Sequence, residues 1–275
     1  MTVRASLWQD TALDTDPRDM AWEQFHESSK TGQYDLALSS EQVLAEMDNL
    51  YPSLPYKNLP AIALPDGLAP LEGRFADIVR ARVTPRTVRP VPLSLLELRT
   101  VLYCAYGETR DNAGDPYIRR AFRTVPSGGG LYPLELYFYQ RGDVEGLEPG
   151  IYHYSPAANA VHLVRPGNAD APIAEGLVAF QRHLASDLSV VVFVTALFQR
   201  SVFKYRNKGY RFCLLEAGHA AQNLNLAATA LGLGVINIGG FFDRRIDDLL
   251  GLDGIHHSVL YLNGLCAGDS HGDIA

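Results

Sequence analysis

The sequence contains little of what holds a small secreted protein or a membrane protein together. Its three cysteines, Cys104, Cys213 and Cys266, are odd in number and far apart, so we expect buried apolar cysteines in a reducing compartment and no disulfide framework. The purest apolar run, residues 190–194, is far shorter than the roughly 20 residues of a membrane-spanning helix. Residues 1–19 also lack the pattern of a secretory signal. These absences predict a cytoplasmic protein that does not bind a membrane.

Positive charge and metal-binding patterns are also scarce. The chain carries 24 Lys and Arg against 31 Asp and Glu, a formal charge of −7, which argues against a general nucleic-acid-binding surface. Its histidines lack the partner spacing of zinc hydrolases, and the sequence contains no G-x-S-x-G motif. We expect no metal site and no hydrolase chemistry of these kinds.

The overall composition is that of a globular protein. The 275 residues are 47% hydrophobic and 20% charged, so the chain can bury a large core. Prolines recur every few residues between Pro52 and Pro70, which is typical of a wrapping extension. We expect an N-terminal extension over residues 1–70, either wrapping or substrate-related, and one main domain over residues 71–275.

Hydrophobic periodicity and turn residues predict a mixed α and β domain. Ser94 and Glu97 have the spacing of a capping box at the start of a helix. The expected helices are residues 40–49, 75–82, 95–106, 172–184, 213–231 and 245–250. The expected strands are residues 136–139, 150–154, 161–164, 189–195, 235–238 and 258–262.

The densest glycine cluster follows a group of arginines. Residues 126–130 are Pro-Ser-Gly-Gly-Gly, and they come after Arg119, Arg120 and Arg123. Residues without a β-carbon let the backbone approach a flat or charged ligand closely and present N–H donors to it. The alternative is a purely structural turn, since neither a P-loop nor a Rossmann fingerprint is present.

A cationic stretch, residues 200–211, follows a predicted buried strand and contains Lys204 and Tyr205. Nearby positive charge favours the neutral form of a lysine and the anionic form of a tyrosine, so such groups can take or relay a proton near neutral pH. The alternative is a solvated basic loop. Three polar residues farther along share one face of a mostly apolar helix and require partners; they are Glu216, His219 and Asn223.

Residues 123–135, RTVPSGGGLYPLE, resemble the signature of the nitroreductase-like flavoenzymes. More narrowly, they resemble the SagB-type branch, the thiazoline and oxazoline dehydrogenases of peptide natural-product assembly. The resemblance covers about 200 residues, from the predicted helix and basic loop that end at Arg86 to the final strand. It includes residues 209–211, 215–223, 232–234 and 239–241. Residues 25–30 also resemble the start of that branch.

The resemblance implies an α+β fold, with a mostly antiparallel central sheet flanked by helices, assembled as a homodimer with FMN at the subunit interface. It assigns the FMN phosphate to Arg82, Thr84 and Arg86. It assigns the flavin ring to Pro126, Ser127, Gly128 and Gly130 on one side and to Gly239 and Gly240 on the other. It also implies that Glu216, His219 and Asn223 contact the subunit interface or the flavin.

One departure from the family pattern concerns the phosphate. Many members hold it with a further cation after the last strand, which residues 268–273 do not supply. We expect either weaker FMN binding or compensation by an upstream arginine such as Arg119, Arg120 or Arg211.

Lys204 and Tyr205 match the catalytic Lys-Tyr pair of the azoline-oxidising branch. The resemblance therefore implies that Tyr205, assisted by Lys204, removes the acidic ring proton of a peptide-embedded or carrier-bound azoline while a hydride leaves for the flavin, which gives the azole. It further implies dioxygen as the electron acceptor. The implied partners are a cyclodehydratase or a peptide synthetase carrier domain.

Three alternatives remain open at this point. The first is an NAD(P)H-dependent nitroreductase-type flavin oxidoreductase. The second is a desaturase of an amino-acid or diketopiperazine Cα–Cβ bond, which needs the same proton and hydride transfer. The third is a flavin-free scaffold protein in a biosynthetic complex.

Overall fold

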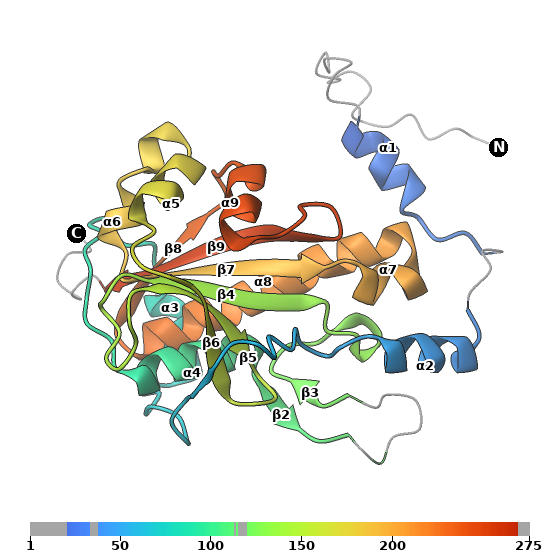
Figure 1. Cartoon of the computed structure of the whole chain (residues 1–275), viewed down its shortest axis with the longest axis horizontal. Helices are drawn as coiled ribbons and strands as arrows, with labels where there is room; N and C mark the ends of the chain where they lie inside the picture. The colour runs from blue at the N-terminus through green and yellow to red at the C-terminus, as the bar shows by residue number, and fades with distance from the viewer. Residues whose placement is uncertain (1–20, 34–37, 113, 115–119, 269–275) are drawn as a thin grey trace.

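The computed structural model describes residues 21–33, 38–112, 114 and 120–268 (Figure 1). At its centre is a seven-stranded sheet in the order β1-β6-β5-β4-β7-β9-β8. Every neighbouring pair in this sheet is antiparallel. The strands are β1 Ala61–Ala63, β4 Leu134–Gln140, β5 Gly150–Ser155, β6 Ala160–Pro166, β7 Val190–Leu197, β8 Leu233–Ile238 and β9 His257–Ala267. A separate two-stranded sheet pairs β2 Glu108–Arg110 with β3 Phe122–Arg123.

Helices cover both faces of the large sheet (Figure 1). They are α1 Ala21–Ser28, α2 Ser40–Asn49, α3 Phe75–Ala81, α4 Leu95–Tyr106, α5 Asp170–Gly176, α6 Leu184–Asp187, α7 Gln199–Tyr205, α8 Asn207–Ala230 and α9 Asp243–Leu250. Because successive side chains of a strand point to opposite faces, the sheet feeds two cores. Leu136 and Phe138 pack in the core under α4 and α8, whereas Tyr139 and Phe193 pack under α5, α6 and α9. The predicted α+β class, with an antiparallel sheet flanked by helices, is confirmed.

The helix start at Ser94 forms as predicted. The Ser94 hydroxyl accepts a hydrogen bond from the Glu97 backbone N–H, and the Glu97 carboxylate accepts one from the Ser94 N–H. An equivalent capping box between Ser39 and Gln42 begins α2. These reciprocal bonds satisfy backbone donors that have no partner inside the helix.

The predicted helix over residues 172–184 is wrong. The structure has α5 to Gly176, a 3-10 turn at Ala179–Gln181, and then the short α6. The helix ends because Leu177 pairs with Phe241 in an isolated bridge and the Val178 N–H donates to the Gly240 carbonyl at 3.0 Å. A tertiary contact with the turn after β8 therefore overrides the amphipathic pattern.

The segment before the long helix also differs from expectation. The solvated-loop alternative for residues 200–211 is wrong, because Lys204 and Tyr205 end α7. Helix α8 begins at Asn207, six residues earlier than predicted, and only Arg206 separates the two helices, with a positive φ of 51°. Both lysines of this stretch are consequently held on helical backbone.

The other predicted elements are confirmed with shifts at their ends. Gly232 ends α8 with a φ of +74°, as expected of a C-terminal glycine, whereas Gly234 lies inside β8. Cys213 and Cys266 are buried, and Cys104 is partly exposed. In the described part of the chain, no helix is long and apolar enough to cross a bilayer.

A buried polar cluster lies where β4 begins. The Glu135 carboxylate pairs with the Arg200 guanidinium at 2.7 Å and with His153 Nε2 at 2.6 Å, and it also accepts the Leu54 N–H at 2.9 Å. Burial raises the pKa of Glu135, but Arg200 and His153 outweigh it, so that the pKa falls to about 2. The folded protein therefore holds this carboxylate charged.

Replacing Arg200 with Met should destabilise the fold by about 3–5 kcal/mol, because it leaves the Glu135 charge buried without its main partner. Urea denaturation at pH 7 measures this loss. The contribution of the pair is present above the unfolded pKa near 4.5 and disappears as the pH falls towards 2, so the two proteins should converge in acid.

The matched control is Arg245→Met, since Arg245 makes an exposed ion pair with Glu175 at 3.2 Å. That change should cost less than about 1 kcal/mol. Equal effects of the two substitutions would contradict the role given to Glu135 and Arg200.

Candidate active site

The glycine cluster forms a tight turn directly before β4. Gly128–Gly130 is a 3-10 turn in which Gly129 and Gly130 have φ values of +68° and +65°. The Ser127 hydroxyl accepts a hydrogen bond from the Tyr132 N–H at 2.9 Å and so closes the loop. Positive φ values favour glycine at these positions, and the missing β-carbon of Gly129 leaves room for side chains of α7.

Lys204 and Tyr205 lie directly over this turn. A β-carbon built on Gly129 would be 2.6 Å from the Tyr205 Oη and 2.9 Å from the Lys204 Nζ. The Tyr205 ring packs edge-on against Phe212 on α8 with ring centroids 4.9 Å apart, which fixes its direction. The fold therefore brings together the two motifs that the sequence singled out separately, residues 126–130 and the Lys-Tyr pair.

A buried carboxyl group lies beneath the same loop. Glu216 of α8 accepts a hydrogen bond from the Tyr106 hydroxyl at 2.6 Å, and that hydroxyl accepts the Leu134 N–H at 3.1 Å. Burial raises the pKa of Glu216 to about 7, against the lowering effect of hydrogen bonds with Ser127 and Tyr106. The carboxyl group ties α4, α8 and the start of β4 together.

The predicted polar face of α8 is divided by the structure. Glu216 is buried, Asn223 is half-buried and donates to the Thr124 carbonyl at 3.3 Å, and His219 is exposed. Of Glu216, His219 and Asn223, His219 is therefore the residue exposed to solvent in a single chain.

The arginines before the glycine loop hold the N-terminal extension. Arg120 is buried and donates to the carbonyls of Met47 and Leu50 at the end of α2. Arg123 donates to the Pro52 carbonyl at 2.8 Å and lies over the Tyr106 ring at 4.3 Å. The Arg120 guanidinium therefore donates its hydrogen bonds to backbone carbonyls of this chain and does not face a ligand. Arg119 lies outside the described residues, and Arg211 contacts Ser29 at 3.4 Å.

The basic segment 82–86 lies at the other end of the sheet. Its Pro85 packs on Gly234 of β8, where an added β-carbon would be 2.4 Å from the proline Cγ. Gly234 pairs with Cys266 of β9, and the neighbouring residue Leu265 pairs with Val190, the first residue of β7. Helix α7 follows the opposite end of β7, whose last residue is Leu197. A strand of this length spans roughly 25 Å. Within one chain, the Arg82, Thr84 and Arg86 side chains are far from Lys204 and Tyr205.

Gly239 and Gly240 form the turn between β8 and α9. An added β-carbon on Gly240 would be 2.6 Å from the Gln181 Oε1, whereas one on Gly239 would meet nothing within 4 Å. Only Gly239 therefore leaves its backbone open to a ligand in this chain.

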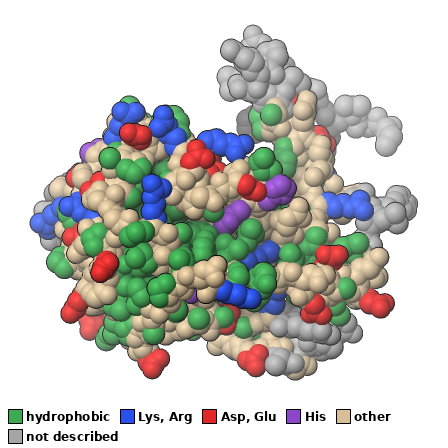
Figure 2. All heavy atoms as spheres, viewed as in Figure 1, with side chains coloured by type: hydrophobic (Ala, Val, Ile, Leu, Met, Phe, Trp, Pro, Cys, Tyr) green, Lys and Arg blue, Asp and Glu red, His purple; other side chains and the backbone are tan. Residues whose placement is uncertain are grey.

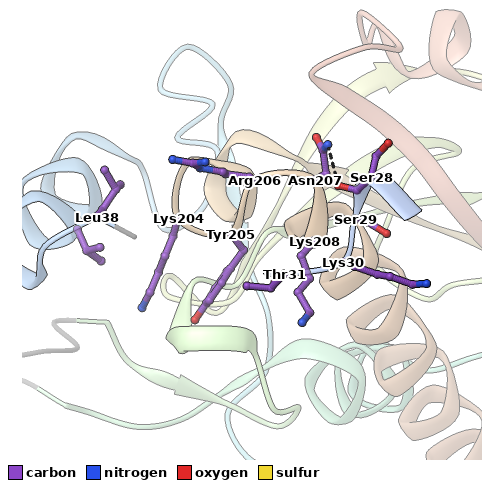
Figure 3. Close-up of a pocket in the computed structure, with 11 residues that line it drawn as sticks. Ser28, Ser29, Lys30, Thr31, Leu38, Lys204, Tyr205, Arg206, Asn207 and Lys208 are labelled. Atoms are coloured by element: carbon purple, nitrogen blue, oxygen red, sulfur yellow. Dashed lines mark hydrogen bonds between the residues drawn. The ribbon is translucent and has the colours of Figure 1, made fainter. Parts of the chain in front are cut away.

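Two cavities flank the site. One of about 460 Å³ is lined by residues 204–208 and by parts of the N-terminal extension (Figure 3). The other, of about 370 Å³, runs along the glycine loop and includes Arg123, Pro126 and Ser127. A half-buried phenol and ammonium group over the glycine loop, between two cavities, form a place where a flat molecule can stack and lose a proton.

This combination of fold and glycine loop agrees with a match of residues 79–264 to the nitroreductase family. The chain belongs to the nitroreductase family. The resemblance drawn from residues 123–135 is thereby confirmed for the family. The "Putative nitroreductase MJ1384" of Methanocaldococcus jannaschii is 35% identical over 179 residues, which are 65% of this chain and 85% of that protein.

Two peptide-processing proteins are also related to this nitroreductase-family chain. The microcin B17-processing protein McbC of Escherichia coli is 31% identical over 134 residues, 48% of this chain and 49% of McbC. The trifolitoxin-processing protein TfxB of Rhizobium leguminosarum bv. trifolii is 27% identical over 140 residues, 50% of this chain and 38% of TfxB. The aligned regions therefore span about half or less of these two relatives.

Solved structures share the fold. A "putative nitroreductase" from Anabaena variabilis has a TM-score of 0.68 at 24% identity, covering 90% of this chain and 47% of that one. A chain of the E. coli microcin synthetase McbBCD complex, with truncated pro-MccB17 bound, has a TM-score of 0.58 at 22% identity, covering 98% of this chain and all of that one. At these identities the likeness establishes the nitroreductase fold.

Sequence reasoning did not single out Tyr106 or Arg200, although both support the site. Tyr106 looks like one more apolar position at the end of a helix, and Arg200 like one of several cations in a basic stretch. Only their burial against Glu216 and Glu135 distinguishes them. Glu135 itself was the last residue of the recognised motif, but nothing in the motif predicted its partner.

Gly129→Ala should displace Lys204 and Tyr205 while leaving the fold intact, because the atoms nearest to the new methyl group belong to the ends of these two side chains and not to the backbone. Gly146→Ala is the matched control, since its φ is +79° but an added β-carbon meets nothing within 4 Å. Both should lower stability by about 1 kcal/mol through the positive φ. The NMR signal of carbon-13-labelled Tyr205 should move only in Gly129→Ala, and an unchanged signal would contradict the geometry described here.

Proposed function

We propose that this protein is an FMN-dependent dehydrogenase that oxidises a thiazoline or oxazoline ring, embedded in a peptide or bound to a carrier, to the azole. The observation that carries the proposal is the position of Lys204 and Tyr205 over Gly129. This arrangement supplies a proton acceptor beside the surface where the family resemblance puts the flavin. The relation to McbC and TfxB, both named for peptide processing, supports a peptide substrate.

The residues assigned to FMN fit that group chemically. Arg82 is half-exposed and Arg86 exposed, and guanidinium groups suit a phosphate. The open backbone at Gly239 would let a flat ring approach closely, and the missing β-carbon of Gly129 leaves room for the ends of Lys204 and Tyr205 beside the glycine loop. When bound, FMN would supply the two-electron acceptor for ring oxidation.

The chain's own residues would handle the proton. Tyr205 would react as the phenolate, which the nearby Lys204 ammonium would stabilise by a charge-assisted hydrogen bond. Its Oη would take the acidic ring proton alpha to the carbonyl and so become the neutral phenol. The second hydrogen leaves the ring with two electrons, so one azoline loses two hydrogens in all. Dioxygen is the proposed final acceptor, which would give one hydrogen peroxide for each ring oxidised.

A homodimer would complete the cofactor site. Because the 82–86 segment lies a strand length from Gly129 in one chain, we propose that one subunit holds the phosphate and the other supplies the glycine loop and the Lys-Tyr pair. Hydrophobic side chains gather across the middle of the face in Figure 2, and Phe75, Leu215 and Phe242 are exposed. Apolar area of this kind is typical of a subunit interface.

Residues 71–275 would form the catalytic domain, and residues 1–70 would complete the site from outside it. The extension adds β1 to the edge of the sheet through pairing with β6. Its residues also contact Glu135, Arg120 and Arg123 near the glycine loop. A cyclodehydratase or a peptide synthetase carrier domain would present the ring.

The direct test is anaerobic reduction of the purified protein, followed in the visible flavin absorption band. An azoline peptide should bleach the band, and NADPH should not. Lys204→Ala and Tyr205→Phe should keep the band but slow azoline oxidation by about a hundredfold or more. The controls Lys57→Ala and Tyr210→Phe should react normally, because neither residue lies over Gly129.

Other outcomes of this experiment would reject the proposal. Bleaching with NADPH alone would favour a nitroreductase-type flavin oxidoreductase. Absence of a flavin band would favour a flavin-free scaffold. Normal azoline turnover in both Lys204→Ala and Tyr205→Phe would remove the catalytic assignment of the pair.

Mixing two inactive variants tests the shared site. An Arg82→Ala, Arg86→Ala double variant and Tyr205→Phe should each fail alone, but mixed dimers should contain one intact site. Random exchange of subunits should then restore about one quarter of wild-type activity. Activity that does not recover would mean that each site is built within one chain.

A further inference from the structure

The cavity beside Lys204 and Tyr205 carries a charge that the proton transfer does not use. Two separate parts of the chain line it: residues 28–31 with Leu38 and Val43, and residues 204–208. Its cationic side chains are Lys30, Lys204, Arg206 and Lys208, and no acidic side chain is among the described residues of its wall. This contrasts with the formal charge of −7 of the whole chain.

Three of these four cations, Lys204, Arg206 and Lys208, form no ion pair with any residue that the structure describes. Lys30 pairs with Glu27. The side chains of Lys204 and Lys208 are half-buried, and in Figure 3 they extend to the same side as Tyr205, while Lys30 extends away. Two half-buried ammonium groups in one cavity repel each other unless an anion lies between them.

The backbone adds to this positive charge. Helix α8, with 24 residues, begins at Asn207 on the cavity wall, and no side chain caps its first turn. The N-terminus of a long helix carries a partial positive charge. The Asn207 side chain instead donates to the Ser28 carbonyl at 3.2 Å, which holds the two walls of the cavity together.

We propose that this pocket binds the carboxylate of an Asp or Glu residue close to the ring in the peptide substrate, an inference that rests on the azoline oxidation proposed above. Lys208 would be the specificity-determining contact, and Lys204 would face both the carboxylate and Tyr205. Leu38 and Val43 offer apolar contacts to the rest of the peptide. The volume of about 460 Å³ is in the range of ligand pockets.

A phosphodiester on a carrier-bound substrate would present the same negative charge. The peptide is favoured because the wall combines cations with apolar side chains and polar loop residues, Ser28 to Thr31, as a short peptide segment requires. Two of the curated relatives are also named for peptide processing.

Binding of non-reactive peptides to the FMN-loaded protein tests this inference apart from catalysis. Fluorescent peptides that already contain the thiazole, with Glu, Gln or Lys two residues from the ring, are compared by anisotropy. The Glu peptide should bind roughly three- to tenfold more tightly than the Gln peptide. The Lys peptide should bind most weakly, and high salt should reduce the differences.

Variants of Lys208 assign the effect to the pocket. Lys208→Gln should remove the preference for the Glu peptide, and Lys208→Glu should reverse it in favour of the Lys peptide. A glutamate in the first turn of α8 suits the helix, so the protein should still fold. Lys57→Gln, an exposed lysine outside the pocket, is the matched control and should leave the preference unchanged.

Equal affinity for the three peptides, or a preference for Glu that survives in Lys208→Glu, would overturn the inference. Displacement of the Glu peptide by a phosphopantetheine compound more readily than by a second acidic peptide would assign the site to a carrier phosphate instead. Oxidation of azoline peptides without any charge preference would reject the pocket assignment and leave the proposed function intact. A charge preference without azoline oxidation would reject the proposed function.

Discussion

The candidate site depends on one buried ion pair. Glu135 is the second residue of β4 and follows the glycine loop, and Arg200 is in the first turn of α7, which ends at Lys204 and Tyr205. Their 2.7 Å contact joins the two segments that must meet over Gly129. Water cannot replace either partner at this depth, because both side chains are almost fully buried. The loop and the Lys-Tyr pair are therefore held in one geometry before any ligand binds.

The same cluster makes the N-terminal extension part of the site. The Leu54 N–H donates a hydrogen bond to the Glu135 carboxylate. Arg120 donates to the Met47 carbonyl near the end of α2, and Arg123 donates to the Pro52 carbonyl. Farther upstream, residues 28–31 close the cationic cavity through Asn207 and Arg211. An extension with little core of its own gains order from these charge-assisted bonds, and in return it forms one wall of the pocket next to Tyr205.

The antiparallel sheet separates the two groups of residues that the proposed cofactor site requires. It carries the glycine loop at one end of β4 and the 82–86 segment at the opposite end of β8. The length of the strands keeps these groups apart, whatever their chemistry. In the proposed homodimer a second copy of the chain would supply the other half, and the exposed apolar side chains of α3 and α8 would give such a copy a surface to cover.

The sequence by itself determined most of the elements and the family. Local signals such as the Ser94 capping box and the hydrophobic runs of β4 and β7 predicted most helices and strands, and the motif of residues 123–135 identified the family. Tertiary contacts decided the rest: the break at Leu177 is imposed by Phe241, and the helical setting of Lys204 and Tyr205 depends on the turn at Arg206. The contact between the Lys-Tyr pair and Gly129, some 75 residues apart, could not be predicted from the sequence. Hydrophobic periodicity predicts which face of a helix or strand is buried, but it does not predict which other element packs against that face. The cations of residues 200–211 were visible in the sequence, but only folding places them opposite residues 28–31 of the extension and so forms the charged pocket.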